Sequence, residues 1–206
     1  MSACNKSLQA SLKWCEGAVS MPGIRKRLYF ISKSKIVAWP EVQKDSDTGR
    51  PSTSVLSGSF ALAADATWNI LDILPDKSQL TSEAQGEAPS QTQLNKLTAV
   101  HPGVEQNATW IAAALNNDDN VFLVEDQDGF IRVVGSQGWP TKTTVAQDNG
   151  QGATGTTSTT ITVEATDIMP APFYEGQIVT EDGTIAAAVS GKRPFAGTVE
   201  DDNNDG

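Results

Sequence analysis

Three glycines form a pattern that resembles a cofactor-binding motif. Gly150, Gly152 and Gly155 match GxGxxG, which in dinucleotide-binding proteins follows a strand and opens a helix whose N-terminus binds pyrophosphate. Here the pattern is followed by TTSTTITVEA, a run typical of a strand. Because the required helix is missing from the sequence pattern, we interpret residues 150–155 as a flexible loop.

Acid–base, nucleophilic and metal chemistry have few candidate residues. His101 is the single histidine, and its place beside Pro102 favours a loop or a helix entry over a catalytic role. Asp201, Asn203 and Asp205 resemble the start of a calcium-binding loop, but the bidentate glutamate that completes such a loop is absent from the sequence. We therefore expect a protein that is not an enzyme, with no catalytic residues, no metal site and no cofactor.

The net charge of −10 is distributed unevenly along the 206 residues. Residues 1–50 carry nine Lys and Arg against four Asp and Glu, which gives +5, and residues 51–206 carry six against twenty-one, which gives −15. This polarity favours head-to-tail contacts between copies and disfavours tight binding of nucleic acid by the acidic part. An acidic surface still suits DNA that slides past without sticking.

The sequence gives no sign of membrane insertion or export. No stretch approaches the ~18–20 apolar residues of a membrane-spanning helix. Lys6 and Lys13 are not followed by the apolar region of a signal peptide. We therefore expect synthesis in a cytoplasm, with Cys4 and Cys15 as reduced thiols.

The first third of the chain predicts a short helix followed by strands. Leu8, Leu12 and Cys15 lie on one helical stripe, and the strands rest on β-branched and aromatic residues. The expected elements are a helix at 5–16, strands at 27–32 and 35–39, a polar loop at 43–53, and two strands within 54–74 around a turn at 63–66.

Residues 76–100 are the most unusual segment, because they contain few apolar residues and no aromatic ones. A disordered linker is one interpretation, since low hydrophobicity does not offset the entropy of ordering. The other interpretation, which we favour, is a long hairpin of two polar strands joined at 85–90. Such an arm would project from the core and would need a partner subunit to order it.

The second half of the chain predicts one helix and several hairpins. Apolar residues recur at helical spacing over 104–116, and Asp-Gly between two apolar runs is a strong hairpin signal. The helix face consists of Val104, Ala108, Ile111, Ala112 and Leu115. The other expected elements are a hairpin of 121–125 and 130–135, a strand at 158–165, a hairpin over 176–189 that turns at Asp182-Gly183, and a frayed acidic tail.

These elements predict a mainly β fold, a β-sandwich or partial barrel with one flanking α-helix, a short N-terminal helix and a long hairpin arm. The expected organisation is an N-terminal extension at 1–23, a single β-rich domain at 24–199 with the arm at 76–100, and an acidic tail at 200–206. The chain is long enough to bury a core without a disulfide scaffold.

The order of several segments resembles the tail tube, or major tail, proteins of tailed phages and prophages of the Bacteroidetes. The resemblance rests on the runs GIRKRLYFISKSKIVAWP, DNVFLVEDQDGFIRVVGSQG, GQGATGTTSTTITVEATD and MPAPFYEG, and it covers about 70% of the chain. It implies a β-sandwich or partial barrel with a helix at its side, a hairpin arm that reaches a neighbouring ring, and an acidic lumen. The N-terminal 23 residues exceed what a minimal tube subunit needs.

The resemblance also implies partners and a location. The subunit would assemble with copies of itself into hexameric rings that stack head to tail, would contact other phage tail proteins, and would let DNA pass through the lumen without specific binding. It would reside in the virion tail, and in the host cytoplasm during assembly. On this interpretation the arm residues Leu80, Ala84, Leu94 and Leu97 pack between subunits, and Glu83 and Glu87 provide acidic contacts or lumen charge.

Two other functions stay open. A capsid decoration or head-fibre protein would form trimers, or monomers that dock on a lattice, and would not stack with itself. A carbohydrate-binding β-sandwich on the virion surface would use tryptophans as platforms for sugar rings, although most of them lie in apolar runs where burial is expected. The five tryptophans are Trp14, Trp39, Trp68, Trp110 and Trp139.

Overall fold

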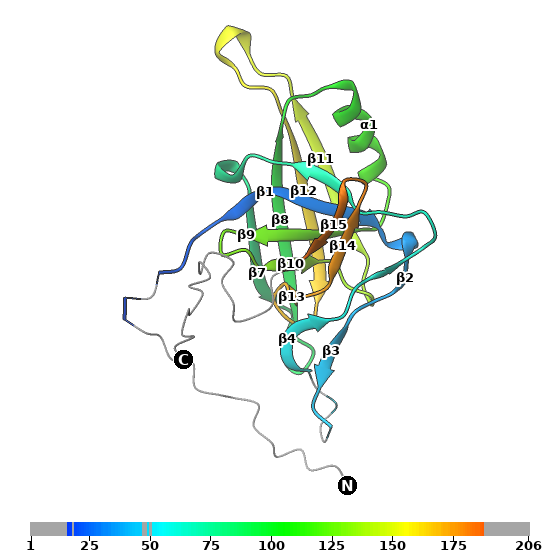
Figure 1. Ribbon diagram of the computed structural model, residues 1–206. Coiled ribbons are helices and arrows are strands. Elements are labelled where there is room, and N and C mark those ends of the chain that lie inside the picture. The colour runs from blue at the N-terminus through cyan, green and yellow to red at the C-terminus, as the bar shows by residue number, and fades with distance from the viewer. Residues whose placement is uncertain (1–15, 18, 47–48, 50, 188–206) are drawn as a thin grey trace, which may run out of the picture.

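A computed structural model describes residues 16–17, 19–46, 49 and 51–187 (Figure 1). Within them the fold is mainly β with one α-helix, as the sequence predicts. The helical segments are η1 (Lys33–Lys35), η2 (Pro75–Lys77), α1 (Gln106–Leu115) and η3 (Gly152–Thr154). The strands are β1 (Ile24–Ser32), β2 (Ile36–Ala38), β3 (Glu41–Lys44), β4 (Pro51–Ser57), β5 (Ala61–Leu62), β6 (Asn69–Asp72), β7 (Gln79–Gln85), β8 (Thr92–Pro102), β9 (Asn120–Asp126), β10 (Ile131–Val134), β11 (Thr141–Asp148), β12 (Ser158–Asp167), β13 (Phe173–Tyr174), β14 (Gln177–Thr180) and β15 (Gly183–Ala186).

Two large sheets make up the body of the molecule. The first has seven strands in the order β3-β4-β13-β10-β9-β1-β6, and the second has four in the order β11-β12-β8-β7. Their strands cross steeply (Figure 1), which is typical of orthogonal sheet packing. Two two-stranded sheets, β14-β15 and β2-β5, complete the described part of the fold. The layers form a sandwich, and the described strands do not close into a barrel.

The central strands of the seven-stranded sheet are buried on both faces. Successive residues of β1 are buried without interruption from Leu28 to Ile31, and β9 is buried from Asn120 to Val124. Side chains of a strand alternate between faces, so this sheet must be covered on both sides. It is therefore the middle layer of the molecule.

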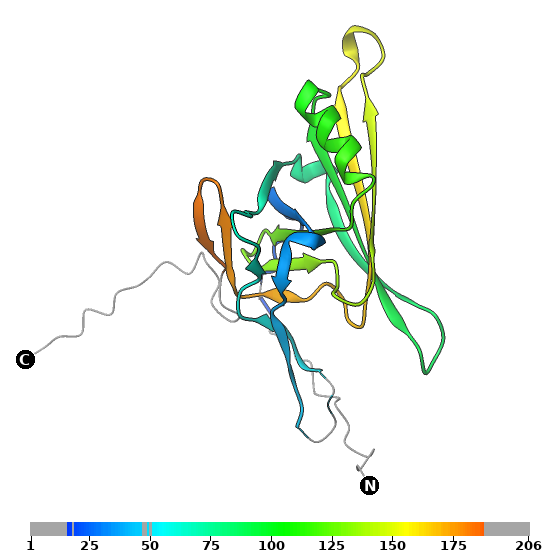
Figure 2. The same ribbon diagram turned by 90° about the vertical axis from the view of Figure 1, so that its right-hand side faces the viewer.

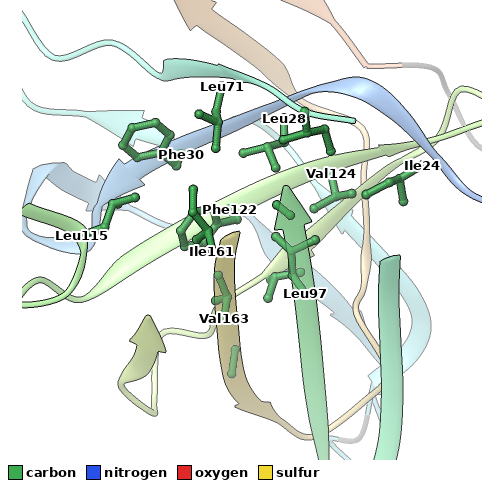
Figure 3. Packing of buried hydrophobic residues seen from close by; sticks show 14 residues of the cluster. Ile24, Leu28, Phe30, Leu71, Leu97, Leu115, Phe122, Val124, Ile161 and Val163 are labelled. Atoms are coloured by element: carbon green, nitrogen blue, oxygen red, sulfur yellow. The ribbon is translucent and has the colours of Figure 1, made fainter. Parts of the chain in front are cut away.

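The four-stranded sheet and α1 cover one face of the middle layer, and together they form the first core (Figure 3). Phe30 and Phe122 of the middle layer stack with ring centroids 6.0 Å apart. Leu97 of β8 and Ile161 of β12 pack against the same cluster. The ordinary alternation of β12 explains this packing, since its even-numbered residues face outward and its odd-numbered residues face the core.

The other face is covered by residues 58–68 and by the β14–β15 hairpin, which form the second core. Phe60 is its centre, with ring centroids 5.2 Å from Trp39, 5.3 Å from Trp68 and 5.2 Å from Tyr174. The Tyr174 hydroxyl donates to the carbonyl of Gln177 at 2.8 Å and accepts the N–H of Phe60 at 3.3 Å. Both links hold the covering segments against the sheet.

Several predicted elements are present. The expected strands at 27–32 and 35–39 correspond to β1 and β2, and the helix at 104–116 to α1. The expected hairpin at 76–100 is present as β7 and β8, but most of it does not project, because β8 pairs with β12 from Gln93 to Pro102 within the subunit's own sheet. The hairpins that turn at 126–129 and at Asp182-Gly183 are β9–β10 and β14–β15. The helix expected at 5–16 and the tail expected at 200–206 lie outside the described residues.

The prediction for residues 43–74 is wrong in its connections. The polar loop is shorter than expected, because β3 extends to Lys44 and β4 begins at Pro51. Residues 54–74 do not form two strands around a turn. Instead β4 pairs with β3 and β13, β5 with β2, and β6 with β1. These partners are distant in sequence, so tertiary contacts decide the pairing.

Replacement of Leu97 by alanine tests whether the arm is continuous with the first core. Its side chain is fully buried, so we expect Leu97→Ala to lower the free energy of unfolding by about 2–5 kcal/mol in urea denaturation. The neighbouring Thr98→Ala, on the outer face of the same strand, should cost less than about 1 kcal/mol. Equal losses in the two variants would contradict the placement of Leu97 in the core.

Candidate functional site

The sequence candidates for chemistry that fall within the described residues are the glycines of 150–155 and His101, whereas Asp201, Asn203 and Asp205 lie outside them. The described residues contain no group of three or more His, Cys, Asp or Glu side chains arranged to hold a metal ion. Residues 150–155 form a turn between β11 and β12, and a strand follows them, as predicted. His101 was expected in a loop or at a helix entry and instead lies within β8, where its Nδ1 is 2.7 Å from the carbonyl oxygen of Asp72. Three surfaces of the described residues are candidate sites.

The first candidate surface is the arm, β7 and β8 with their connection at 86–91 (Figure 2). The two strands are antiparallel over seven residue pairs, from Gln79 opposite Thr98 to Gln85 opposite Thr92. On its other side β8 pairs with β12 as far as Gln93. The part of the arm beyond Gln93 therefore extends past its neighbour strand.

The six arm residues singled out in the sequence do not share one face. The register and the strand alternation place Leu80, Ala84 and Leu97 on the core side, and Glu83 and Leu94 on the outer side. Glu87 lies in the exposed connection. Leu97 is fully buried in the core of its own subunit, and Leu80 packs against the same core, which leaves no surface of Leu97 for a neighbouring subunit. Glu83, Ala84 and Glu87 are exposed.

A buried asparagine fixes the base of the arm. Asn95 is 1% exposed, and its Oδ1 accepts the hydroxyl of Ser82 at 2.6 Å and the N–H of Ala171 at 2.9 Å. Its Nδ2 donates to the carbonyl of Met169 at 3.3 Å. The amide thereby joins β7, β8 and the segment after β12. No sequence signal indicated this role, because Asn95 lies in a polar run.

The outer face of the four-stranded sheet is polar and nearly balanced in charge. Lys142, Glu164 and Lys96 stand side by side on three strands, with Nζ–Oε distances of 3.9 Å and 3.6 Å. Threonines occupy the neighbouring positions Thr144, Thr162 and Thr98. Such exposed ion pairs contribute little to stability, so this face is hydrophilic without a strong field of either sign.

The edge of this sheet at β11 is partly capped by side chains. Asp119 Oδ1 accepts the N–H of Thr141 at 2.9 Å, and Asn116 Oδ1 accepts the N–H of Val145 at 2.7 Å. Capping of this kind blunts an edge strand against pairing with another chain. The sequence did not predict β11. Its inward-facing residues Thr141 and Thr143 are threonines, so the expected apolar alternation is absent.

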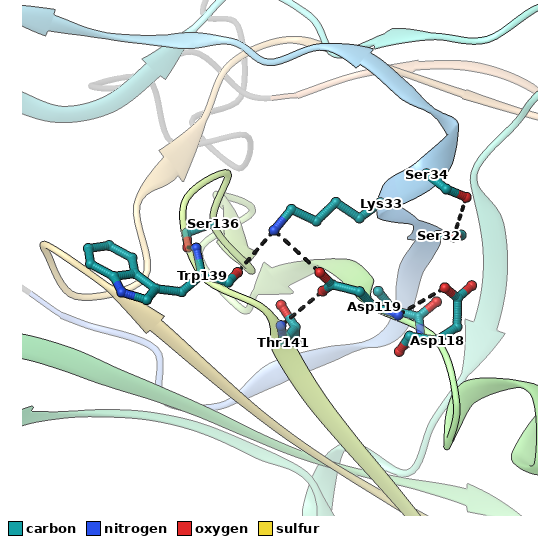
Figure 4. Close-up of polar contacts among 9 residues, drawn as sticks. Ser32, Lys33, Ser34, Asp118, Asp119, Ser136, Trp139 and Thr141 are labelled. Carbon is teal, nitrogen blue, oxygen red and sulfur yellow. Dashed lines mark hydrogen bonds and ion pairs between the residues drawn. The ribbon is translucent and has the colours of Figure 1, made fainter.

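Asp119 also belongs to a polar cluster that holds the loop after β10 (Figure 4). Lys33 Nζ lies 3.4 Å from Asp119 Oδ2 and donates to the carbonyl of Trp139 at 3.0 Å. The backbone N–H of Trp139 donates to Ser136 Oγ at 3.2 Å. The Lys33 ammonium also lies 5.9 Å from the ring centroid of Trp39, within range of a cation–π interaction. One lysine therefore positions two tryptophans.

Those two tryptophans border a second candidate surface, a cleft of about 520 Å³ that we call the Trp139 cleft. Trp139 and Ile168 are exposed at 39% and 55%. Asp167 also borders the cleft. Burial raises the pKa of the Asp167 carboxyl above its ordinary value of 3.8, although the hydrogen bond from the Ile168 N–H lowers it.

The third candidate surface is a groove of about 650 Å³ between α1 and the turn of the β14–β15 hairpin, which we call the α1 groove. Figure 2 shows the helix and this hairpin on either side of β6. Phe30, Ile70 and Ile111 contribute apolar side chains to the lining. Asp118, Glu181 and Asp182 also line it and are exposed.

Trp110 forms one wall of the α1 groove and is 72% exposed. The expected burial of most tryptophans holds for Trp68 and, in part, for Trp39. It is wrong for Trp110 and Trp139, and Trp14 lies outside the described residues. The helical period carried a signal for Trp110, because position 110 is not among the apolar residues of the predicted helix face.

The basic run at the start of β1 is matched by acidic residues of neighbouring strands. Arg25 pairs with Glu125, and Arg27 Nε lies 3.2 Å from Asp72 Oδ1. Arg132 Nε lies 2.9 Å from Asp126 Oδ2, and its guanidinium stacks 3.8 Å from the Phe173 ring centroid. Burial is the main cause of a raised pKa for Glu125 and Asp126, and the arginines oppose it. These ion pairs join neighbouring strands.

Comparison with protein-family models, with curated proteins and with solved structures finds no match to this chain. Within the described residues no helix is both long enough and apolar enough to cross a membrane.

Removal of the Asp119 carboxylate tests the polar cluster. We expect Asp119→Ala to lower the free energy of unfolding by about 1–3 kcal/mol in urea denaturation, because the partly buried N–H of Thr141 loses its acceptor. Asp118→Ala, at the adjacent exposed position, should cost less than about 1 kcal/mol. A smaller loss for Asp119→Ala than for Asp118→Ala would rule out the cap on β11.

The raised pKa of Asp167 predicts a pH-dependent stability. A carboxyl whose pKa is raised by folding favours the native state below its unfolded pKa and loses this contribution as pH rises through the folded value. We expect Asp167→Asn to be at least as stable as the parent protein at neutral pH, with an advantage that disappears below about pH 3.8. Urea denaturation at both pH values measures this. A destabilised variant at neutral pH would show that the charged carboxylate is needed.

Proposed function

We propose that this protein is a structural, non-enzymatic phage virion subunit that assembles with copies of itself into stacked rings of a tail tube. The main support is the geometry of the four-stranded sheet. It packs on the core by one face only, ends at strand β7, and carries an arm that extends past β12 at one end. On this proposal the open face, the β7 edge and the arm are the surfaces that associate.

The arm is suited to reach a neighbour because its base is rigid and its tip is polar and exposed. Asn95 and Leu97 fix the base in the subunit's own interior. Glu83, Ala84 and Glu87 remain available near the tip. We therefore assign inter-subunit contact to the distal half of the arm, with Leu94 on the outer face as its apolar contribution.

The two sheet edges are not equivalent for ring closure. β7 ends the sheet, and on the opposite side Asp119 and Asn116 already accept two N–H groups of β11. A strand of a neighbouring subunit has no access to those two donors while the caps are in place. Pairing of sheets into a shared wall would remove the β7 edge, which otherwise invites uncontrolled association.

On this proposal the outer face of the four-stranded sheet is the wall that DNA passes. The outer face of the four-stranded sheet carries Lys96 and Lys142 beside Glu164, so it does not repel phosphate strongly by itself. Glu83 adds a negative charge nearer the arm tip. On this proposal DNA passes a hydrophilic, threonine-rich wall without specific contacts. The subunit would reside in the virion tail with other tail proteins as partners.

One observation favours a second candidate function, a carbohydrate-binding sandwich on the virion surface. Trp110 is exposed beside Asn107, Asp118 and Asp182, and an aromatic platform with carboxylates and amides can bind sugars. Quenching of tryptophan fluorescence by a soluble glycan, abolished in Trp110→Ala, would favour this function. A decoration protein would instead give discrete trimers or monomers.

Shortening the arm tests the proposed assembly. Residues 84–93 are deleted and Glu83 is joined to Leu94, its cross-strand partner, through Asn-Gly, which favours a two-residue hairpin turn. We expect the parent protein to form large assemblies in sedimentation velocity, and the variant to keep its circular dichroism spectrum and to lose them.

The control is Ser90→Ala, which keeps the arm at full length and should assemble as the parent does. Equal assembly of the shortened variant would remove the arm from the contact. A parent protein that sediments as a monomer at every concentration would contradict the proposed function.

A further inference from the structure

The α1 groove combines an apolar lining with acidic residues, which suits an amphipathic, basic occupant. Phe30, Ile70 and Ile111 give it apolar lining, and the exposed ring of Trp110 stands over it. Asp118, Glu181 and Asp182 place three carboxylates around it. The side chains of Glu181 and Asp182 are exposed. An occupant that buries Trp110 and neutralises this rim would remove an apolar surface from water.

We propose that residues 1–15 of a second copy of this chain bind in the α1 groove. This inference rests on the proposed function, since it names the partner of one of the assembling surfaces. The segment carries Lys6 and Lys13 and contains no Asp or Glu. Leu8, Leu12 and Cys15 recur at helical spacing, which is the anchor pattern of a helix that lies in a groove. Apolar anchors meet the lining, and the lysines meet the carboxylates.

The direction of β1 favours a neighbour's segment over the subunit's own. Ser32, at the end of β1, lines the groove, whereas Ile24, at its start, lies at the opposite end of the strand (Figure 1). A strand of nine residues separates these ends by about 26 Å. The chain therefore enters the fold on the side away from the groove. A second copy that lies beside the Ile24 end of β1 can bind residues 1–15 in its α1 groove, and these residues need not turn back toward the groove of their own subunit.

Such a contact joins two different surfaces of identical subunits. Contacts of this type repeat from one copy to the next and generate rings or filaments. The contact also brings the two lysines of residues 1–15, Lys6 and Lys13, toward the acidic rim of the groove. Electrostatic attraction between exposed charges weakens with salt, so association by this contact should decrease as salt is added.

The native cysteines allow a direct test on the full chain. Cys4 and Cys15 are the only two cysteines, and both lie in the proposed segment. The protein is labelled with a benzophenone maleimide, irradiated as a mixture of ¹⁴N and ¹⁵N chains, and digested for mass spectrometry. We expect light–heavy cross-links from the labelled cysteines to peptides that contain Trp110 or Glu181–Asp182. Cross-links only to other regions, or only within one chain, would overturn the proposal.

Two matched variants test the charge complementarity. Glu181→Gln with Asp182→Asn removes two rim charges and should lower the yield of these inter-chain cross-links about fivefold. Asp76→Asn with Asp148→Asn removes the same number of charges at exposed positions outside the groove and the arm, and should leave the yield unchanged. Equal yields in the two variants would remove the rim from the contact. Circular dichroism checks that both are folded.

The outcomes separate this inference from the proposed function. Tube-like assemblies without cross-links to the α1 groove would retain the tail tube and overturn the groove contact. Cross-links to the groove in particles that stop at dimers would support the groove contact and contradict the tube. Fluorescence quenching of the parent by chitobiose or maltose, lost in Trp110→Ala and without groove cross-links, would assign the groove to a sugar and overturn the proposal.

Discussion

The structure depends on one constraint, the burial of both faces of the central strands β1, β9 and β10. Buried apolar side chains such as Leu28, Tyr29 and Phe122 lie on both faces of this layer. The sheet therefore needs a cover on each side, and two different covers provide it. The four-stranded sheet with α1 encloses the first core, and residues 58–68 with the β14–β15 hairpin enclose the second. Loss of either cover would expose a continuous apolar layer.

This three-layer arrangement also decides which surfaces are left for partners. One face of the four-stranded sheet packs against the first core. Its other face, its β7 edge and the arm tip face away from the core. The cover of the second core ends in the turn at Glu181 and Asp182, opposite α1, and the space between them is the α1 groove. Packing thus places an extended arm, an open sheet edge and an acidic groove on one small domain. We consider association to be the activity that these three features serve.

The sequence predicted those parts of the fold that depend on local signals. The run VFLVE, an Asp-Gly turn and a helical period at 104–116 identify β9, its hairpin and α1 without knowledge of the rest. The arm hairpin was also predicted, but not which of its residues face inward, since alternation does not tell which face meets a core. The partners of β5 and β6 are distant in sequence, so the local pattern at 54–74 indicated strands but not their pairing. Strand β11 was not predicted, because its inward-facing Thr141 and Thr143 hide the apolar alternation. The α1 groove is lined by residues of β1, β6, α1 and the β14–β15 turn. Because these segments are far apart in sequence, no local pattern could predict the groove.

The claim that most of this account depends on is self-association into an ordered, repeating assembly. Negative-stain electron microscopy of the purified full chain across a concentration series tests it most directly. The account predicts rings that stack into hollow tubes as concentration rises. Compact monomers or trimers at every concentration would contradict it, and would leave the sandwich as a protein that binds another lattice or a glycan.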